Sequence, residues 1–154
     1  MKRLLTFLAA AALLAAPTFA RDEKTAIEEF KKDVASLKAW ADEKEKSFEG
    51  DPLAPLRAIG EMVEKFKAVN TEGLPADLKE PWVAAAAVFG KVATMAAQIP
   101  KDQAEAAKKL EDPAFQKEFM GQMMDLQKEM LPTVEKLKAA AKKYGIEGLD
   151  KIGG

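Results

Sequence analysis

Apolar side chains recur every three or four positions along almost the whole chain after residue 20, with charged residues between them. That spacing places the apolar residues on one face of an α-helix. The hydroxyl of Thr25 and the carboxylate of Glu28 have the form of a capping box, so we expect the first helix to begin at Thr25 and to end at Gly50. Its expected buried face consists of Ile27, Phe30, Val34, Leu37, Ala41 and Phe48.

Two further long helices are indicated by the same periodicity. Asp51-Pro52 is a start signal, because proline is tolerated in a first turn, and the pattern then runs to Asn70. Residues 71–75 concentrate glycine and proline and predict a connection. Asp77 and Pro81 lead into the most apolar helix, expected from Trp82 to Ile99. The expected buried faces are Leu56, Ile59, Val63, Phe66 and Val69 in the first of these helices, and Trp82, Ala85, Phe89, Val92, Ala96 and Ile99 in the second.

The last third of the chain carries two more helix signals. Asp102-Gln103-Ala104-Glu105 resembles a cap and predicts a short helix to about Leu110. Asp112-Pro113 begins a long helix to Tyr144, with a kink expected near Pro132 and a stop at Gly145, followed by an apolar contact from Ile146. Its expected buried face consists of Phe119, Met123, Leu126, Met130, Leu137, Ala141 and Tyr144.

The pattern as a whole predicts an all-α protein. No stretch alternates with a period of two over the length of a strand. We expect an antiparallel up-and-down helical bundle of about four long helices and one short helix over residues 21–145. A glycine-rich tail, 146–154, follows, in which Leu149 and Ile152 are expected to dock loosely.

Residues 1–20 have the composition of a cleavable signal peptide. A basic start at Lys2 and Arg3 precedes an apolar run to Ala16, and small residues precede the expected cleavage after Ala20. The run is shorter than the roughly 20 residues of a membrane span and is followed directly by charges. We therefore expect a periplasmic or secreted protein, and no transmembrane anchor in its mature form.

Charge and composition exclude several classes of function. Of the 24 basic and 25 acidic residues, residues 1–20 contain two basic and no acidic ones, so the mature chain has a net charge of −3 and offers no basic surface for nucleic acid. The chain contains no cysteine and no histidine. Thiol nucleophiles, histidine triads and histidine-zinc centres are therefore excluded, and we expect a non-enzymatic protein with no cofactor.

Methionine is the candidate for special chemistry. Met120, Met123 and Met124 lie within one and a half turns of the last helix, where their thioethers can converge on Cu(I) or Ag(I). The alternative, which the periodicity favours, is that these flexible side chains fill the core. The two interpretations differ in whether the three side chains surround a shared void or disperse into the core.

A second region open to two interpretations is the apolar stretch of the third helix. Small residues at Ala86, Gly90 and Ala93 allow another helix to approach closely, either inside the bundle or in a homodimer. Burial inside the bundle is favoured, because an exposed patch of that size is unusual on a soluble monomer.

In layout alone, a signal peptide followed by about 130 helical residues, the chain resembles the exported four-helix-bundle cytochromes of the b562 and c-prime type. The resemblance implies a haem held by a histidine of the last helix, in the c-prime case within a Cys-x-x-Cys-His sequence. The helix from Pro113 to Tyr144 contains neither residue type, so electron transfer does not carry over. A haem held by two methionines would need Met62 or Met95 with a methionine of the last helix.

Together these observations predict an exported helical protein that acts by contact, binding a protein, an envelope component or an apolar ligand, or serving a structural role. The alternative function is soft-metal binding through Met120, Met123 and Met124.

Overall fold

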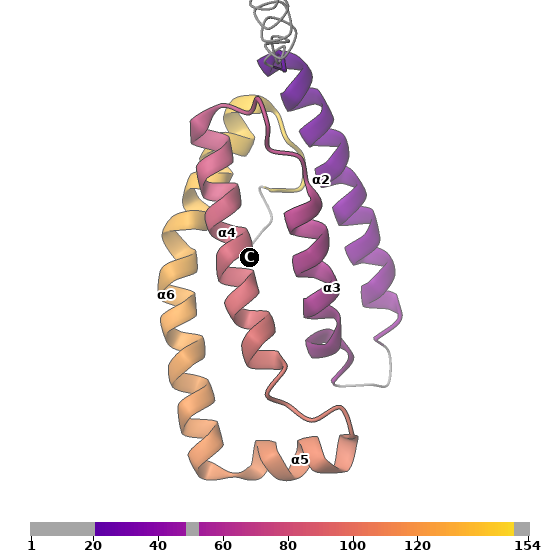
Figure 1. The fold of residues 1–154 in the computed structure, drawn as a ribbon, viewed down its shortest axis with the longest axis vertical. Helices are drawn as coiled ribbons and strands as arrows, with labels where there is room; N and C mark the ends of the chain where they lie inside the picture. Colours follow the sequence, from indigo (N-terminus) through magenta and orange to yellow (C-terminus); the bar gives the residue numbers. More distant parts are fainter. Residues whose placement is uncertain (1–20, 49–52, 150–154) are drawn as a thin grey trace, which may run out of the picture.

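The computed structural model describes residues 21–48 and 53–149, and over this part of the chain the protein is all-α (Figure 1). The predicted signal peptide, Gly50, Asp51-Pro52 and Ile152 lie outside the described residues. The first helix nevertheless ends at Lys46, before the expected stop at Gly50, and the second begins at Ala54, after the expected start. The helices are α2 (Glu23–Lys46), α3 (Ala54–Ala68), α4 (Ala76–Ala96), α5 (Gln103–Glu111) and α6 (Pro113–Tyr144).

The long helices lie beside one another with α4 between α3 and α6, and α2 packs on the far side of α3 (Figure 1). Two cross-helix ion pairs fix the relative direction of α4 and α6: Asp77 pairs with Lys143, and Lys91 pairs with Glu129. Since the residue number rises along one helix as it falls along the other, α4 and α6 are antiparallel. The short α5 lies across the lower end in this view and leads into α6.

The first helix begins two residues before the expected N-cap. The carboxylate of Asp22 accepts a hydrogen bond from the Thr25 amide at 3.2 Å, so Asp22 is the N-cap and Glu23 begins α2. Thr25 lies inside the first turn, and its hydroxyl also donates to Asp22. The prediction of Thr25 as N-cap was wrong, because aspartate caps at least as well as threonine and a carboxylate favours the positive end of the helix dipole.

The start of α4 also differs from expectation, since the helix begins at Ala76 and continues through Pro81. The amides of Leu78 and Lys79 both donate to the Pro75 carbonyl and form the first turn. Proline at position 81 removes one backbone hydrogen bond, but Leu78, Pro81 and Trp82 are all buried on this helix. Their burial outweighs the lost bond. At the other end, regular helix stops at Ala96, and residues 97–99 continue as turns.

The helix signals of the last third are confirmed. Asp102 caps α5 through the amides of Ala104 and Glu105, and Asp112 caps α6 through the Ala114 amide. Gly145 ends α6 in the left-handed region with φ 63°. The amide of Ile146 then donates to the Ala141 carbonyl at 2.9 Å, the bond of a Schellman motif. Pro132 lies inside a continuous α6, and the kink stays a prediction.

The main core forms around Trp82, which is almost fully buried. Its indole stacks on Phe66 with ring centroids 3.9 Å apart, and Phe30 meets it edge-on at 4.9 Å. The indole N–H donates to the Phe66 carbonyl at 3.2 Å, so the buried ring has no unpaired donor. α2, α3 and α4 are joined through this aromatic group.

The residues that follow α6 belong to the same core. Ile146 and Leu149 are 3% and 2% exposed and pack in the main cluster. From sequence alone, an apolar contact was expected from Ile146, but Leu149 was expected to dock only loosely. The described part of the tail, 146–149, instead turns back between the helices and fills space in their interior.

Candidate binding surfaces

Three of the four methionines of α6 are exposed to solvent. Met120, Met123 and Met124 have exposed fractions of 60%, 39% and 55%, and Leu131 further along α6 is 57% exposed. The three methionines therefore neither surround an enclosed void nor disperse into the core. The expectation of core packing was wrong for these three side chains, whereas Met130 is partly buried against the core as expected. We call Met120, Met123, Met124 and Leu131 the methionine face.

The exposure follows from how the first half of α6 is packed. Phe115 and Phe119 point toward α5 and the end of α4, where they pack with Leu53, Ile99 and Ala106. The buried face of α6 then continues through Leu126, Val134 and Leu137. Met120 and Met124 lie beside this line, where helical spacing turns them away from α4 and α5. Sequence periodicity indicated a broad apolar face, but the neighbouring helices cover only part of it.

An apolar hollow opens where the second half of α2 faces α3, α4 and the tail. Its volume is about 260 Å³. We call it the α2 hollow. It is lined by Val34, Leu37, Lys38, Trp40, Ala41, Met62, Phe66, Phe89, Gly148 and Leu149.

The hollow exists because α2 is packed tightly only through its first half. Ala26, Phe30 and Val34 are the buried residues of α2. The expected buried face continues to Leu37 and Ala41, but Leu37 is only partly buried and Ala41 is exposed. The prediction of a fully buried α2 face was therefore wrong at Leu37 and Ala41, and Ile27 in the first half is also only partly buried. In the sequence, the apolar positions that continue past Val34, with Trp40 beside them, indicate this site. Periodicity alone does not distinguish such positions from those of a buried core.

Two lysines, Lys44 and Lys65, lie near the Trp40 ring, and a third, Lys38, lines the α2 hollow. The ammonium groups of Lys65 and Lys44 lie 5.4 and 5.9 Å from the centroid of the Trp40 ring. Such contacts place cations over the ring face, which carries partial negative charge. Lys44 also pairs with Glu61 at 2.8 Å across to α3. These contacts hold Trp40 half-exposed at the edge of the hollow.

A polar cluster joins the ends of α4 and α6. Asp77 accepts from the Lys143 ammonium at 2.6 Å and from the Tyr144 hydroxyl at 2.7 Å. The hydrogen bond from Lys143, followed by the one from Tyr144, lowers the pKa of Asp77 below its usual value. The same bond raises the pKa of Lys143. With its carboxylate engaged by two donors, Asp77 connects the start of α4 to the end of α6.

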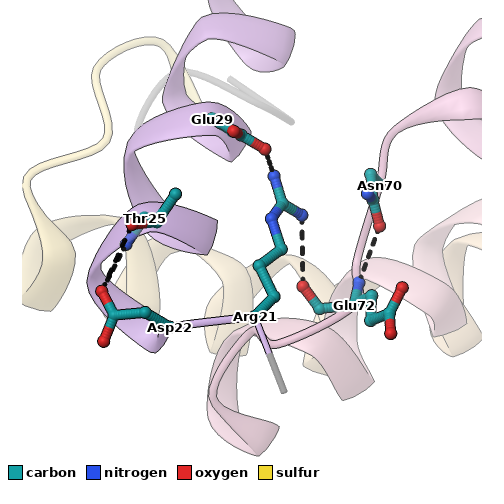
Figure 2. Close-up of polar contacts among 6 residues, drawn as sticks. All are labelled: Arg21, Asp22, Thr25, Glu29, Asn70 and Glu72. Carbon is teal, nitrogen blue, oxygen red and sulfur yellow. Dashed lines mark hydrogen bonds and ion pairs between the residues drawn. The ribbon is translucent and has the colours of Figure 1, made fainter. Parts of the chain in front are cut away.

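The beginning of α2 is connected to the loop between α3 and α4 by Arg21 (Figure 2). Its guanidinium donates to the Glu72 carbonyl at 3.2 Å and pairs with Glu29 on α2. Gly73, with φ 77°, passes so close that a Cβ there would lie 2.8 Å from the Arg21 carbonyl oxygen. The Glu72 amide in turn donates to the Asn70 side chain at 2.9 Å.

The remaining predictions have mixed outcomes. Of the small residues expected to be buried on α4, Ala86 is buried, whereas Gly90 and Ala93 are only partly buried. Among the described helices there is none long and apolar enough to cross a membrane. Within residues 21–48 and 53–149, no three acidic, histidine or cysteine side chains gather as a metal site would require.

Comparison with protein-family models, with curated proteins and with solved structures found no match to this chain.

Proposed function

We propose that this protein is an exported, non-enzymatic helical bundle that acts by binding a protein or another component of the envelope. The observation that supports this function best is the methionine face. Four large apolar side chains on one face of α6 are exposed to water. Methionine is common on surfaces that bind partners of varied shape, because its side chain is flexible and polarisable.

Export is supported by the composition of residues 1–20. Cleavage after Ala20 would leave Arg21 as the first residue, and its side chain is already engaged with Glu29 and the Glu72 carbonyl. The proposal predicts a protein in the periplasm or medium whose amino-terminal sequence begins at Arg21. Recovery of the uncleaved chain from the cytoplasm would contradict it.

Cross-linking in the native envelope tests the binding function. Wild-type protein should give a discrete cross-linked complex that is lost when Met120, Met123 and Met124 are all changed to glutamine, which keeps side-chain length and helix propensity. Asp125→Asn with Lys128→Gln alters exposed polar residues of the same helix and provides the control. If the triple variant forms the same complex in the same amount as wild type, the methionine face is not the binding surface.

Soft-metal binding is the second candidate. It is supported by the accessibility of three thioethers at positions i, i+3 and i+4 of one helix, where they can converge. Titration with Cu(I) against a competing chelator should show metal bound by wild type and not by the triple glutamine variant. Absence of competition at micromolar metal would exclude this function and leave the binding proposal untouched.

A further inference from the structure

We propose that the α2 hollow binds a single-chain amphiphile with a carboxylate head, as in a free fatty acid. The chain would lie against Trp40, Phe66 and Phe89, and the carboxylate would lie among Lys38, Lys138 and Lys142. This inference is independent of the methionine face, which is on a different helix surface.

The walls of the hollow are suited to a hydrocarbon chain. Leu37, Trp40 and Ala41 continue the apolar face of α2 after its last buried residue, and Met62 and Phe89 face them from α3 and α4. A folded protein gains roughly 25 cal/mol for each Å² of apolar surface removed from water, so an unfilled apolar wall is a site where a hydrocarbon would bind favourably. Lys38 is the charged residue of this lining.

The floor of the hollow is formed before any ligand arrives. Phe66 stacks on Trp82, its own carbonyl accepts the Trp82 N–H, and Phe89 meets it edge-on at 5.1 Å. A ring packed against two neighbouring rings loses little freedom when a ligand packs on it. Pre-formed apolar walls with few polar groups are typical of small-molecule sites.

The size of the hollow favours an acyl chain over a peptide helix. A helix about 10 Å wide and 5.4 Å per turn needs roughly 400 Å³ for each turn. The hollow, at about 260 Å³, is smaller than one such turn. It corresponds to roughly nine groups of the volume of a water molecule, which suits a chain of medium length.

The charge of the head group is indicated by a second hollow that adjoins the first. The two share Lys38 and Gly148. Three lysines line the second hollow, against a single acidic residue, Glu147. Its full lining is Lys38, Lys138, Ala141, Lys142, Gly145, Ile146, Glu147 and Gly148.

These lysines are available to an anion. Within the described part of the chain, Lys38, Lys138 and Lys142 form no ion pair with an acidic side chain. The stem of Lys38 can lie along the apolar wall while its ammonium stays in water, as long basic side chains commonly do. A molecule with an apolar chain and a carboxylate could therefore place its chain in the α2 hollow and its carboxylate in the lysine-lined hollow at the same time.

Fluorescence of Trp40 provides the test, with dodecanoate as the probe below its micelle concentration. Burial of the half-exposed Trp40 by the chain should shift its emission to the blue, and the shift should vanish in Trp40→Phe while the buried Trp82 still emits. Dodecanol should bind more weakly and dodecyltrimethylammonium more weakly still. No shift with dodecanoate, or equal affinity for all three probes, would overturn the proposal.

Matched variants locate the site. Ala41→Phe fills the hollow and should weaken dodecanoate binding by about tenfold or more, whereas Ala39→Phe, on an exposed part of α2 outside the lining, should leave it unchanged. Lys38→Gln should weaken dodecanoate by about three- to fivefold and leave dodecanol unchanged. Circular dichroism confirms that each variant is folded. If Ala39→Phe and Ala41→Phe have the same effect, the hollow is not the site.

Two further experiments test whether something other than a free fatty acid occupies the α2 hollow. Protein that binds vesicles of anionic phospholipid but not free dodecanoate would overturn the proposal in favour of a membrane surface. A variant that ends at Leu149 tests whether residues 150–154 occupy the hollow. Binding seen only after this truncation would show that the chain's own end fills the site, and the proposal would be wrong for the whole protein.

Discussion

Two residues, Gly73 and Asp77, illustrate how single side chains connect elements that are distant in sequence. Gly73 lies in the left-handed region and passes close to the Arg21 backbone. A residue with a Cβ at this position would clash with the Arg21 carbonyl oxygen. Asp77 connects the start of α4 to the end of α6 through Lys143 and Tyr144. Neither role has a local sequence signature, because each depends on a partner more than 45 residues away.

Replacing Gly73 with alanine should destabilise the protein by about 2 kcal/mol or more, through an unfavourable φ and contact with the Arg21 carbonyl. Gly121→Ala is the control, because Gly121 lies in α6 with open space where its Cβ would be. That change should stabilise by about 0.5–1 kcal/mol. Urea unfolding measures both, and equal effects at the two positions would contradict this account.

The Asp77 cluster predicts a pH dependence of stability. Because the folded state lowers the pKa of Asp77, its ionised form stabilises the fold above the ordinary aspartate pKa of about 4, and this contribution is lost as the pH falls through the folded pKa. The raised pKa of Lys143 keeps that partner charged throughout this window. The difference in free energy of unfolding between wild type and Asp77→Asn should therefore shrink between about pH 6 and pH 2. A difference that does not change with pH would contradict the role of the ionised carboxylate.

At the scale of helices, local capping signals decided most boundaries. The N-caps Asp102 and Asp112 and the helix stop at Gly145 were predicted from sequence and are confirmed. Caps can be recognised in this way because they bond to backbone groups only two to four residues away. The predicted start of α2 was wrong because Asp22, three residues earlier, accepts a hydrogen bond from the Thr25 amide and so caps the helix before Thr25. The start of α4 was wrong because burial of Leu78 and Trp82 outweighs a proline in the helix.

Asp112→Ala tests the cap at the junction of α5 and α6. Loss of its bond to the Ala114 amide should lower the free energy of unfolding by about 1 kcal/mol. The neighbouring exposed residue Glu111, changed to alanine, should have an effect below about 0.5 kcal/mol. Thermal unfolding of both variants makes the comparison, and a cap variant as stable as wild type would show that tertiary packing alone holds this junction.

At the scale of the whole molecule, the packing of elements decides which apolar faces are covered. The tail after α6 enters the core through Ile146 and Leu149. Apolar residues in the second half of α2 line the α2 hollow, and apolar residues in the first half of α6 are exposed to water. These uncovered faces are the basis of both binding proposals.

The tail is therefore expected to contribute to stability as a core element does. Leu149→Ala should cost about 2–5 kcal/mol, since the side chain is almost fully buried. Leu131→Ala, which truncates the same side chain on the exposed methionine face, should cost less than about 0.5 kcal/mol. Equal losses in urea unfolding would mean that the tail is not part of the core.

The sequence by itself determined that the described chain is all-α, where α5 and α6 begin, and that cysteine and histidine chemistry is absent. Periodicity and capping are local, so they can be recognised without knowing the fold. Only the tertiary structure decided that Met120, Met123 and Met124 face solvent, that α2 leaves a hollow after Val34, and that Leu149 returns to the core. An amphipathic helix specifies which face is apolar, but which part of that face is covered depends on how closely its neighbours approach.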